Sequence, residues 1–574
     1  MTLINDSSVN RHSFSTTARL AWIVLILVTL YICYFHNLGV IGLVGPDEPR
    51  YAWIARDMVE SGDWVTPRLY GKPWFEKPVL YYWGAALSFK LFGVGEVAAR
   101  LPSAFSALLA TLAMAWLAWR VYGAETARWL LLLLPTTVGM IGFSHAAAMD
   151  MPFSGMLTIA LVCSAIVVGL TRDAHTPILP RTAWFALLLF GFFLGLATLA
   201  KGPAAIVLAG GAALLRAVLT KRWRDAFRCL HPVAIASFCL TALPWYILCA
   251  RHNPEFFRIF IIEHNLKRYL TPQFQHIQPF WFYIPILLVA FVPWTMLLVW
   301  ATSFGSLWAW HKKNLSPLTI FLLCWSAFCL LFFSVSQSKL PGYILPAIPA
   351  MGLLLARSYV RLVPEFEKAF RWVLFAGAAI IALLGLAFSL FFGRMQSSSP
   401  TAKAGTTVAL VLLLFALANL LLAATKTFAR AQLTAALSSV LPVLLLVCLF
   451  GPLSSAFRVN SLYSGQTIAG ELAANNIPSD QLYYAFMHRG QQYSLSFYLH
   501  HEIQQWNSKN AKPGYLLVSS RNCKEVVKPP WMCSDDPIQL DSNGWLVYRV
   551  AREDLMSGLG RLGEGRGSLD TRDR

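Results

Sequence analysis

Long apolar runs recur along this chain from residue 20 to about residue 452, and only short polar segments separate them. A helix needs roughly 17 to 25 apolar residues to cross about 30 Å of hydrocarbon, and most of these runs reach that length. Of the 574 residues, 57% are hydrophobic and only 13% are charged. The sequence therefore predicts an integral membrane protein that is mostly helical.

Placing a helix on every sufficiently long run predicts about thirteen membrane spans. We expect them near residues 20–36, 101–119, 129–146, 152–170, 183–200, 203–219, 232–250, 281–301, 317–335, 343–357, 372–392, 405–424 and 432–452. The first run follows Arg11 and Arg19 and has no convincing small-residue cleavage site. We interpret it as an uncleaved signal anchor.

Lys and Arg gather in the short loops on one side of the predicted bundle, for example at 221–224, 311–313 and 426–430. This distribution is typical of cytoplasmic loops, and it explains the formal net charge of +19 without nucleic-acid binding. The opposite, extracytoplasmic side then receives residues 37–100, 147–151, 251–280, 336–342 and the chain from 453 onward.

The composition predicts three domains, at 1–452, 453–555 and 556–574. The first is an all-α membrane domain whose external loop, 37–100, carries aromatic-rich stretches typical of interfacial helices. The second has a helical pattern that ends at 471–476 and strand-like runs that begin at Tyr483, Tyr515 and Trp545, which predicts a small α/β domain. The last is rich in Gly and charge, and we expect it to be disordered.

Eight of the ten cysteines lie in apolar runs, where a thiol usually packs as a small apolar group. The other two, Cys523 and Cys533, lie ten residues apart in the polar C-terminal region. If that region is extracytoplasmic, these two cysteines are a plausible disulfide.

Asp150 is the only charged residue in the apolar stretch from Trp129 to Leu170. A carboxylate within hydrocarbon costs about 2.5 to 3.5 kcal/mol at the worst depth, so we expect Asp150 to have a partner or a function. Lys201 is a lone cation between two apolar runs in the same way. Both residues fall at the external ends of their predicted spans.

The positive-inside rule predicts few Lys and Arg residues on the external side, yet several fall there, among them Lys77, Lys201, Arg258, Lys267, Arg268 and Lys339. Five separate segments thus bring ionisable groups to one face. Independent solvated loops are one interpretation of this pattern, and a composite site is the other. The excess of cations favours a site for an anion, and a lipid phosphate lies at this depth in the membrane.

Several short motifs occur in a distinctive order along the chain. They are Gly-Pro-Asp47-Glu48-Pro-Arg50-Tyr51, Lys72-Pro-Trp-Phe-Glu76-Lys77-Pro78, Met149-Asp150, Leu-Ala-Lys201-Gly202-Pro203 and Ser338-Lys339-Leu-Pro341-Gly-Tyr343. This order resembles the polyprenyl-phosphate-dependent glycosyltransferases of the GT-C type, a group that includes the protein O-mannosyltransferases. Within it, the likeness is to the bacterial transferases that add 4-amino-4-deoxy-L-arabinose to lipid A.

The resemblance implies an enzyme of the bacterial inner membrane that transfers a sugar from undecaprenyl phosphate to a periplasmic acceptor. It implies that Asp47 and Asp150 are the catalytic carboxylates. The groups that it implies for the donor phosphate and sugar are Arg50, Tyr51, Lys77, Tyr81, Lys201, Arg268, Lys339 and Tyr343. Glu76 and His264 are candidate ligands of a divalent metal, although zinc usually takes three or four ligands.

The role of Asp47 depends on the acceptor. A hydroxyl acceptor needs a general base, whereas a phosphate with a second pKa of about 6 is already largely deprotonated. In the second case Asp47 would orient the donor, for instance by pairing with a sugar amine.

Other functions fit part of the pattern. The same transfer reaction could add galacturonic acid to lipopolysaccharide, or it could use a protein as the acceptor. A lipid flippase would be equally basic and aromatic, but such transporters place ionisable groups at the bilayer midplane and show internal repeats, neither of which we find here. An assembly factor for the envelope would leave Asp47, Asp150 and the external cations without a purpose.

Overall fold

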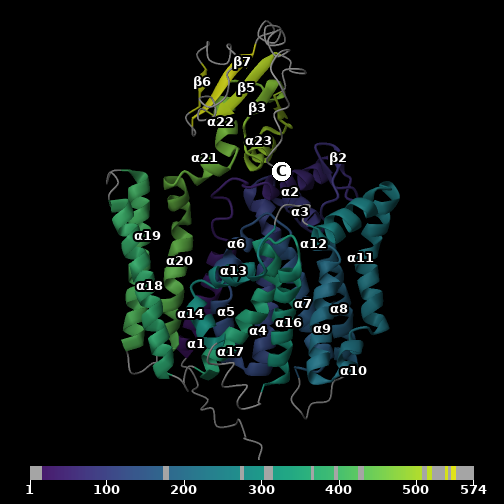
Figure 1. The fold of residues 1–574 in the computed structure, drawn as a ribbon, viewed down its shortest axis with the longest axis vertical. Coiled ribbons are helices and arrows are strands. Elements are labelled where there is room, and N and C mark those ends of the chain that lie inside the picture. Colours follow the sequence, from purple (N-terminus) through teal and green to yellow (C-terminus); the bar gives the residue numbers. More distant parts are fainter. Residues whose placement is uncertain are drawn as a thin grey trace, which may run out of the picture.

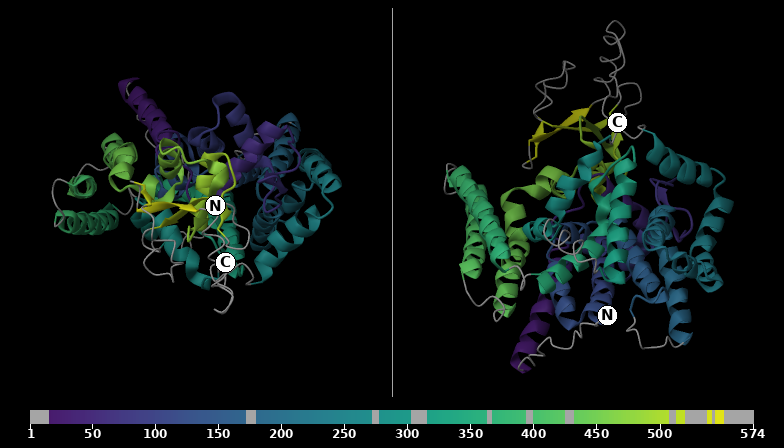
Figure 2. Two further views of the ribbon diagram at one scale, coloured as in Figure 1. Left: turned by 90° about the horizontal axis from the view of Figure 1, so that it is seen from above. Right: turned by 60° about the horizontal axis from the view of Figure 1, so that its bottom comes forward.

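The computed structural model describes residues 16–171, 180–271, 277–302, 315–362, 367–393, 399–424, 432–506, 513–519, 537–540 and 544–550. Long helices stand side by side in a bundle, and a small sheet lies beyond one end of it (Figure 1). Seen from above, the sheet lies over the middle of the bundle (Figure 2). Cys523, Cys533 and the predicted tail 556–574 lie outside the described residues.

The bundle is built from α1 (Thr16–Tyr34), α4 (Glu96–Tyr122), α5 (Ala124–Leu133), α6 (Val138–Ser144), α7 (Asp150–Val167), α8 (Pro180–Lys201), α9 (Ala204–Thr220), α10 (Trp223–Arg228), α11 (Pro232–His252), α13 (Tyr283–Ala290), α14 (Thr295–Trp300), α16 (Pro317–Val335), η6 (Pro341–Ala347), α17 (Ile348–Leu362), α18 (Glu367–Gly393), α19 (Pro400–Ala424) and α20 (Gln432–Ala456). In the described part of the chain, eight helices are long and apolar enough to cross a membrane, or nine if the bent pair α5 and α6 is one span. The length and apolar composition of these helices confirm the prediction of a multi-pass membrane protein.

Two of the predicted continuous spans are broken helices. The predicted span 129–146 is divided between α5 and α6, which meet at an angle of 62°, and the predicted span 281–301 is divided between α13 and α14. Pro135 and Pro293 lie in the two breaks, and proline removes a helix hydrogen bond and clashes with the preceding turn. The prediction of uninterrupted helices was wrong at these two places.

The two breaks lie against each other. The backbone amide of Val138 donates to the carbonyl of Val292 at 3.0 Å, and Trp294 Nε1 donates to Thr136 Oγ1 at 2.9 Å. Backbone groups freed from a helix must find partners inside the protein when no water is available. Each break therefore supplies hydrogen-bond partners to the other.

Shorter elements cover the end of the bundle that faces the sheet (Figure 1). They are α2 (Asp47–Ser61), α3 (Leu80–Phe92), the hairpin strands β1 (Arg68–Leu69) and β2 (Lys72–Pro73), the π-helix η2 (Arg258–Lys267), α12 (Arg268–Leu270) and η4 (Phe280–Phe282). The helices predicted in the 37–100 loop are thus present as α2 and α3. The π-helix within 251–280 was not predicted.

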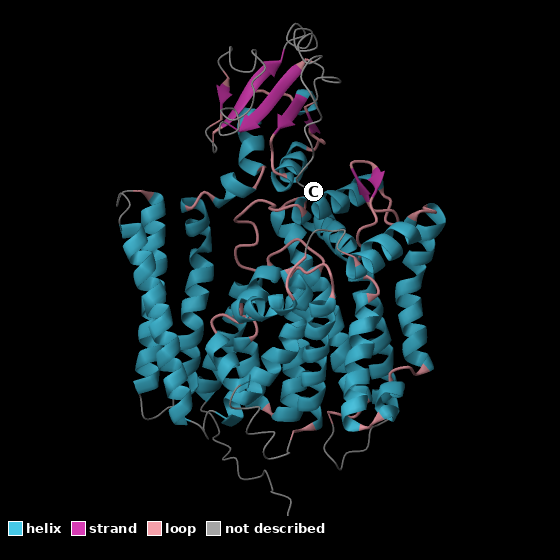
Figure 3. Cartoon of the chain, viewed as in Figure 1, coloured by secondary structure: helices cyan, strands magenta, loops and turns pink. Residues whose placement is uncertain are grey.

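The C-terminal region contains α21 (Val459–Tyr463), α22 (Gln466–Ala474), η8 (Ser479–Gln481), β3 (Leu482–Ala485), α23 (Arg489–Leu499), β4 (Gln504–Gln505), β5 (Gly514–Ser519), β6 (Ile538–Gln539) and β7 (Trp545–Val550). The five strands form one sheet in the order β4-β3-β5-β7-β6. Strand β3 is parallel to β4 and β5, and β7 is antiparallel to β5 and β6. Figure 3 shows these strands against the helical remainder. The three predicted strands and the predicted helix are confirmed as β3, β5, β7 and α22.

Candidate active site

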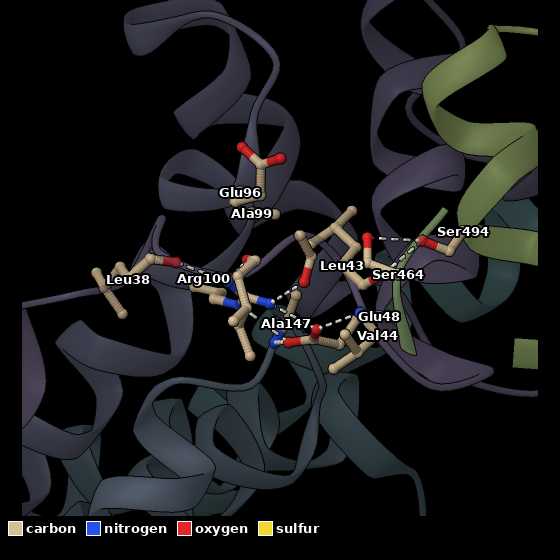
Figure 4. A network of polar contacts seen from close by, with 12 residues as sticks. Leu38, Leu43, Val44, Glu48, Glu96, Ala99, Arg100, Ala147, Ser464 and Ser494 are labelled. Carbon is tan, nitrogen blue, oxygen red and sulfur yellow. Dashed lines mark hydrogen bonds and ion pairs between the residues drawn. The ribbon is translucent and has the colours of Figure 1, made fainter. Parts of the chain in front are cut away.

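A buried ion pair anchors the chain at the point where α2 begins. Arg100 Nη2 lies 2.7 Å from Glu48 Oε2, and both side chains are almost fully enclosed. Arg100 also donates to the carbonyls of Leu38 and Ile41 at 2.7 Å and of Gly42 at 3.0 Å. Figure 4 shows how this guanidinium gathers the loop that leads to α2.

The carboxylate of Glu48 also binds two backbone amides. It accepts hydrogen bonds from the amides of Val44 at 2.9 Å and Ala147 at 2.7 Å. It therefore ties the 38–46 loop to the turn before α7, where Asp150 begins the helix. Its neighbour Asp47 points away from this network and is 51% exposed.

Arg50 holds two carboxylates of the candidate site together. Its Nη2 lies 2.5 Å from Asp47 Oδ1, its Nη1 lies 3.4 Å from Glu76 Oε2, and its Nε donates to the carbonyl of Pro46 at 2.7 Å. The guanidinium also lies over the rings of Tyr51, Trp74 and Tyr493. Only 6% of the side chain is exposed, so Arg50 is committed to groups of the protein itself.

Asp150 has the partner that its isolation in the sequence predicts. It forms an ion pair with Lys201, which ends α8. The ammonium of Lys201 also lies 4.7 Å from the centre of the Tyr343 ring. Three segments that are far apart in the sequence therefore meet at this point.

Lys77 lies beside this ion pair and makes no ion pair or hydrogen bond of its own with the described residues. Burial and, after it, the positive charges of Arg268 and Lys201 lower the pKa of Lys77 to about 7, although the negative charges of Glu76 and Asp150 oppose this shift. The cations Lys77, Arg268 and Lys201 thus lie close together, with the carboxylates of Glu76 and Asp150 near them. The arrangement attracts an anion.

Glu76 and His264 lie within electrostatic range of each other. Burial lowers the pKa of His264, and the negative charge of Glu76 opposes that shift. Among the described residues, no group of three or more His, Cys, Asp and Glu side chains gathers in metal-binding geometry. A metal ion at this pair would need further ligands from water or substrate.

Two residues that the sequence predicts for the site bind the backbone instead. The hydroxyl of Tyr81 donates to the carbonyl of Ala99 at 2.8 Å. The ammonium of Lys339 donates to the carbonyls of Ser336 at 2.6 Å and Gln278 at 3.0 Å. The structure brings the remaining predicted residues into two adjoining groups, which are Asp47, Arg50, Tyr51 and Glu76 in one and Lys77, Asp150, Lys201, His264, Arg268 and Tyr343 in the other.

Sequence reasoning missed Arg100 and Tyr493. Arg100 lies directly before a predicted span, where a charged residue is common, so the sequence does not distinguish it from other flanking charges. Tyr493 lies in the C-terminal domain, more than 400 positions from its partner Arg50. No spacing rule connects residues at such a separation.

Residues 20–260 match the family model described as dolichyl-phosphate-mannose-protein mannosyltransferase. The undecaprenyl phosphate-alpha-4-amino-4-deoxy-L-arabinose arabinosyl transferase of Edwardsiella ictaluri is 34% identical over 351 residues, 60% of this chain and 61% of that protein. The transferase of the same name from an Enterobacter species is 32% identical over 365 residues, 63% of this chain and 64% of its own length. The matched segments therefore span less than two thirds of these relatives.

The fold provides a broader comparison. The crystal structure of ArnT from Cupriavidus metallidurans bound to undecaprenyl phosphate superposes with a TM-score of 0.74 at 25% sequence identity, and the match covers 93% of this chain and 98% of that one. It includes both the bundle and the C-terminal region. In sequence this chain is thus similar to the named arabinosyl transferases, and in fold it is similar to ArnT from Cupriavidus metallidurans.

Proposed function

We propose that this chain is a glycosyltransferase of the bacterial inner membrane that moves 4-amino-4-deoxy-L-arabinose from undecaprenyl phosphate to a phosphate of lipid A. The observation that carries the proposal is Lys77, a part-buried cation beside Arg268 and Lys201 that forms no ion pair with the described residues. A donor phosphate would supply the missing negative charge. The relatives whose names state this sugar and this lipid carrier support the choice of donor.

The proposed topology has thirteen spans with the sheet domain, α2 and α3 on the periplasmic side. Beyond the eight long helices and the bent pair, four shorter apolar helices are present at Ala204–Thr220, Phe280–Ala290, Gly377–Phe391 and Val440–Ala456. Together these segments support the count. The proposed domain division remains 1–452, 453–555 and 556–574, and a disulfide between Cys523 and Cys533 remains a proposal for the periplasmic region.

In the proposed reaction, the bond between the anomeric carbon and the polyprenyl phosphate breaks as an acceptor oxygen attacks that carbon. Negative charge develops on the departing phosphate, and Lys77 and Arg268 stabilise it. Asp47 extends from the start of α2 with half of its side chain exposed, while Arg50 fixes its orientation. It either removes the proton of a hydroxyl acceptor or pairs with the amine of the sugar.

The metal pair Glu76 and His264 also remains a proposal. A divalent ion there would add positive charge next to the donor phosphate. Glu76 already accepts a hydrogen bond from Arg50 at 3.4 Å, so such an ion would share this carboxylate with the guanidinium.

Lys77→Ala is expected to raise the KM for the polyprenyl donor more than tenfold, because a charge-assisted contact to phosphate is worth about 1.5 to 3 kcal/mol. Protein levels and thermal stability should change little. Lys72→Ala is the matched control, since Lys72 is an exposed lysine of the same loop. An unchanged dependence of rate on donor concentration would contradict the assignment. The measurement is initial rate against donor concentration in proteoliposomes.

Donor binding should weaken as the pH rises through about 7, where Lys77 loses its proton in the empty site. The phosphodiester keeps its negative charge throughout this range, so only the lysine titrates between binding and non-binding forms. The dissociation constant should then rise about tenfold per pH unit until the pKa of the bound state is reached. Lys77→Arg, whose guanidinium stays charged, should flatten the profile. A flat profile in the unsubstituted protein would show that Lys77 does not carry the charge that binds the donor.

Mass spectrometry of lipid A tests the function as a whole. Cells with the active protein should gain an aminopentose on a lipid A phosphate, and cells without it should not. A gain that matches galacturonic acid, or a glycosylated protein with unmodified lipid A, would support the same chemistry on another substrate. Movement of a lipid-linked sugar across the membrane without transfer would support a flippase.

A further inference from the structure

The C-terminal domain reaches the candidate site through one helix, α23. The Ser494 hydroxyl donates to the carbonyl of Leu43 at 2.6 Å, and the Leu43 amide donates to the Tyr498 hydroxyl at 2.8 Å. Both contacts fall on the loop that leads into Asp47, and Figure 4 shows Ser494 beside Leu43. One helical turn away, the Phe497 carbonyl accepts a hydrogen bond from Arg56 Nη1 at 3.0 Å. Helix α23 is therefore held to both the loop and α2.

Tyr493 extends from this anchored helix toward Arg50. The Arg50 guanidinium carbon lies 5.3 Å from the centre of the Tyr493 ring, and the Arg489 guanidinium carbon lies 5.4 Å from the same ring. The ring also stacks on Tyr70 with an interplanar angle of 20°. The C-terminal domain thus supplies an aromatic wall against the arginine that holds Asp47 and Glu76.

The Tyr493 ring differs from an ordinary apolar packing contact, because two guanidinium groups, those of Arg50 and Arg489, lie near it. A guanidinium within about 6 Å of a ring centre is attracted by the negative face of the ring. Tyr51 and Trp74 provide similar contacts at 5.7 Å and 5.4 Å, but both belong to the first external loop. Of these three rings, Tyr493 is the one contributed by the C-terminal domain.

A displaced guanidinium would move Asp47, because Arg50 Nη2 lies only 2.5 Å from its carboxylate. A misplacement of about 1 Å at a reacting group lowers catalytic rates steeply. Donor affinity should be less sensitive, since Lys77 and Arg268 lie on other segments. The expected signature is a fall in kcat with little change in the KM for the donor.

We propose that Tyr493 is a positioning residue of the transferase site, which acts by holding Arg50 and, through Arg50, the carboxylate of Asp47. This inference rests on the proposed function for its kinetic test. It assigns the C-terminal domain a part in the chemistry that neither the sequence motifs nor the relatives' names describe.

The test compares Tyr493→Leu with Tyr493→Phe in the full-length protein, reconstituted with a polyprenyl-phosphate aminopentose donor and lipid A. Leucine keeps apolar bulk but has no aromatic face, and kcat should fall about fivefold with the donor KM unchanged. Phenylalanine keeps the face and should restore most of kcat. In an Arg50→Lys background, Tyr493→Leu should add little further loss, because the two residues act as a unit.

Tyr463→Leu is the matched control, because this tyrosine of the same region is 61% exposed. Hydrogen exchange at the amides of residues 42–52 gives a second readout that needs no sugar transfer. Exchange should be faster in Tyr493→Leu than in the control. If the unsubstituted protein transfers no sugar but this difference is present, the proposed function fails and the positioning role stands. If Tyr493→Leu changes neither kcat nor exchange, or if Tyr493→Phe is equally impaired, the proposal is overturned.

Discussion

Asp47→Asn is expected to lower the rate of sugar transfer by about 10³-fold, since removal of a group that moves a proton or fixes a reacting substrate has effects of this order. The protein should remain folded. Asparagine has the same shape, and its oxygen still accepts the hydrogen bond that Arg50 donates to Asp47. The side chain is 51% exposed, so the surrounding core does not depend on its charge.

The measurement is transfer in proteoliposomes, accompanied by the melting temperature of the purified protein. Glu60→Gln is the control, because Glu60 is a carboxylate of the same helix that is 64% exposed and pairs only loosely with Arg56 at 3.7 Å. It should transfer at the unsubstituted rate. Normal transfer by Asp47→Asn to both a hydroxyl acceptor and a lipid A phosphate would contradict the assignment of this residue.

The same variant separates the two roles of Asp47. If the carboxylate is a general base, the loss should be large with a hydroxyl acceptor and small with a phosphate acceptor that is already deprotonated. If it pairs with the sugar amine, the loss should be similar for both acceptors. In that case a donor sugar without the amine should react equally poorly with the unsubstituted protein.

Glu48→Ala is expected to destabilise the protein by about 3 to 5 kcal/mol, because it leaves the buried charge of Arg100 without its counter-ion. The exposed Glu60→Ala should cost less than about 1 kcal/mol. Thermal unfolding in one detergent compares the two directly. The double variant Glu48→Ala, Arg100→Met should recover part of the loss, because no buried charge then remains. A melting temperature for Glu48→Ala equal to that of Glu60→Ala would contradict this role.

The helices could be predicted well, because a helix that lies in lipid appears in the sequence as a continuous run of apolar residues. Most long apolar runs become single helices, two are divided between two helices, and the polar region after residue 453 contains the predicted strands. The breaks at Pro135 and Pro293 were missed, since apolar runs continue through both prolines. Only the contact between the two breaks, from Val138 to Val292, shows how the freed backbone groups are satisfied.

The candidate site could be predicted where a residue type was unusual for its surroundings. A lone carboxylate such as Asp150 needed a partner, and Lys201 provides it. The motif around Asp47 contains three charged residues whose roles cannot be distinguished from the sequence alone. The structure buries Glu48 against Arg100, leaves Asp47 half exposed, and turns Arg50 toward two carboxylates. These differences come from partners that are distant in the chain.

The loop before Asp47 is bound by residues that are synthesised about 400 positions later. Gly42 donates its amide to Asn460 Oδ1 at 2.9 Å, and a β-carbon on Gly42 would lie 2.2 Å from Ser464 Oγ, so the two segments touch without space for a side chain. A nascent chain that has inserted its first helices still lacks these contacts. These contacts of the loop therefore form only after the region from residue 453 onward has been synthesised. The same order implies that two separately expressed pieces, divided before residue 453, should regain activity only when they assemble.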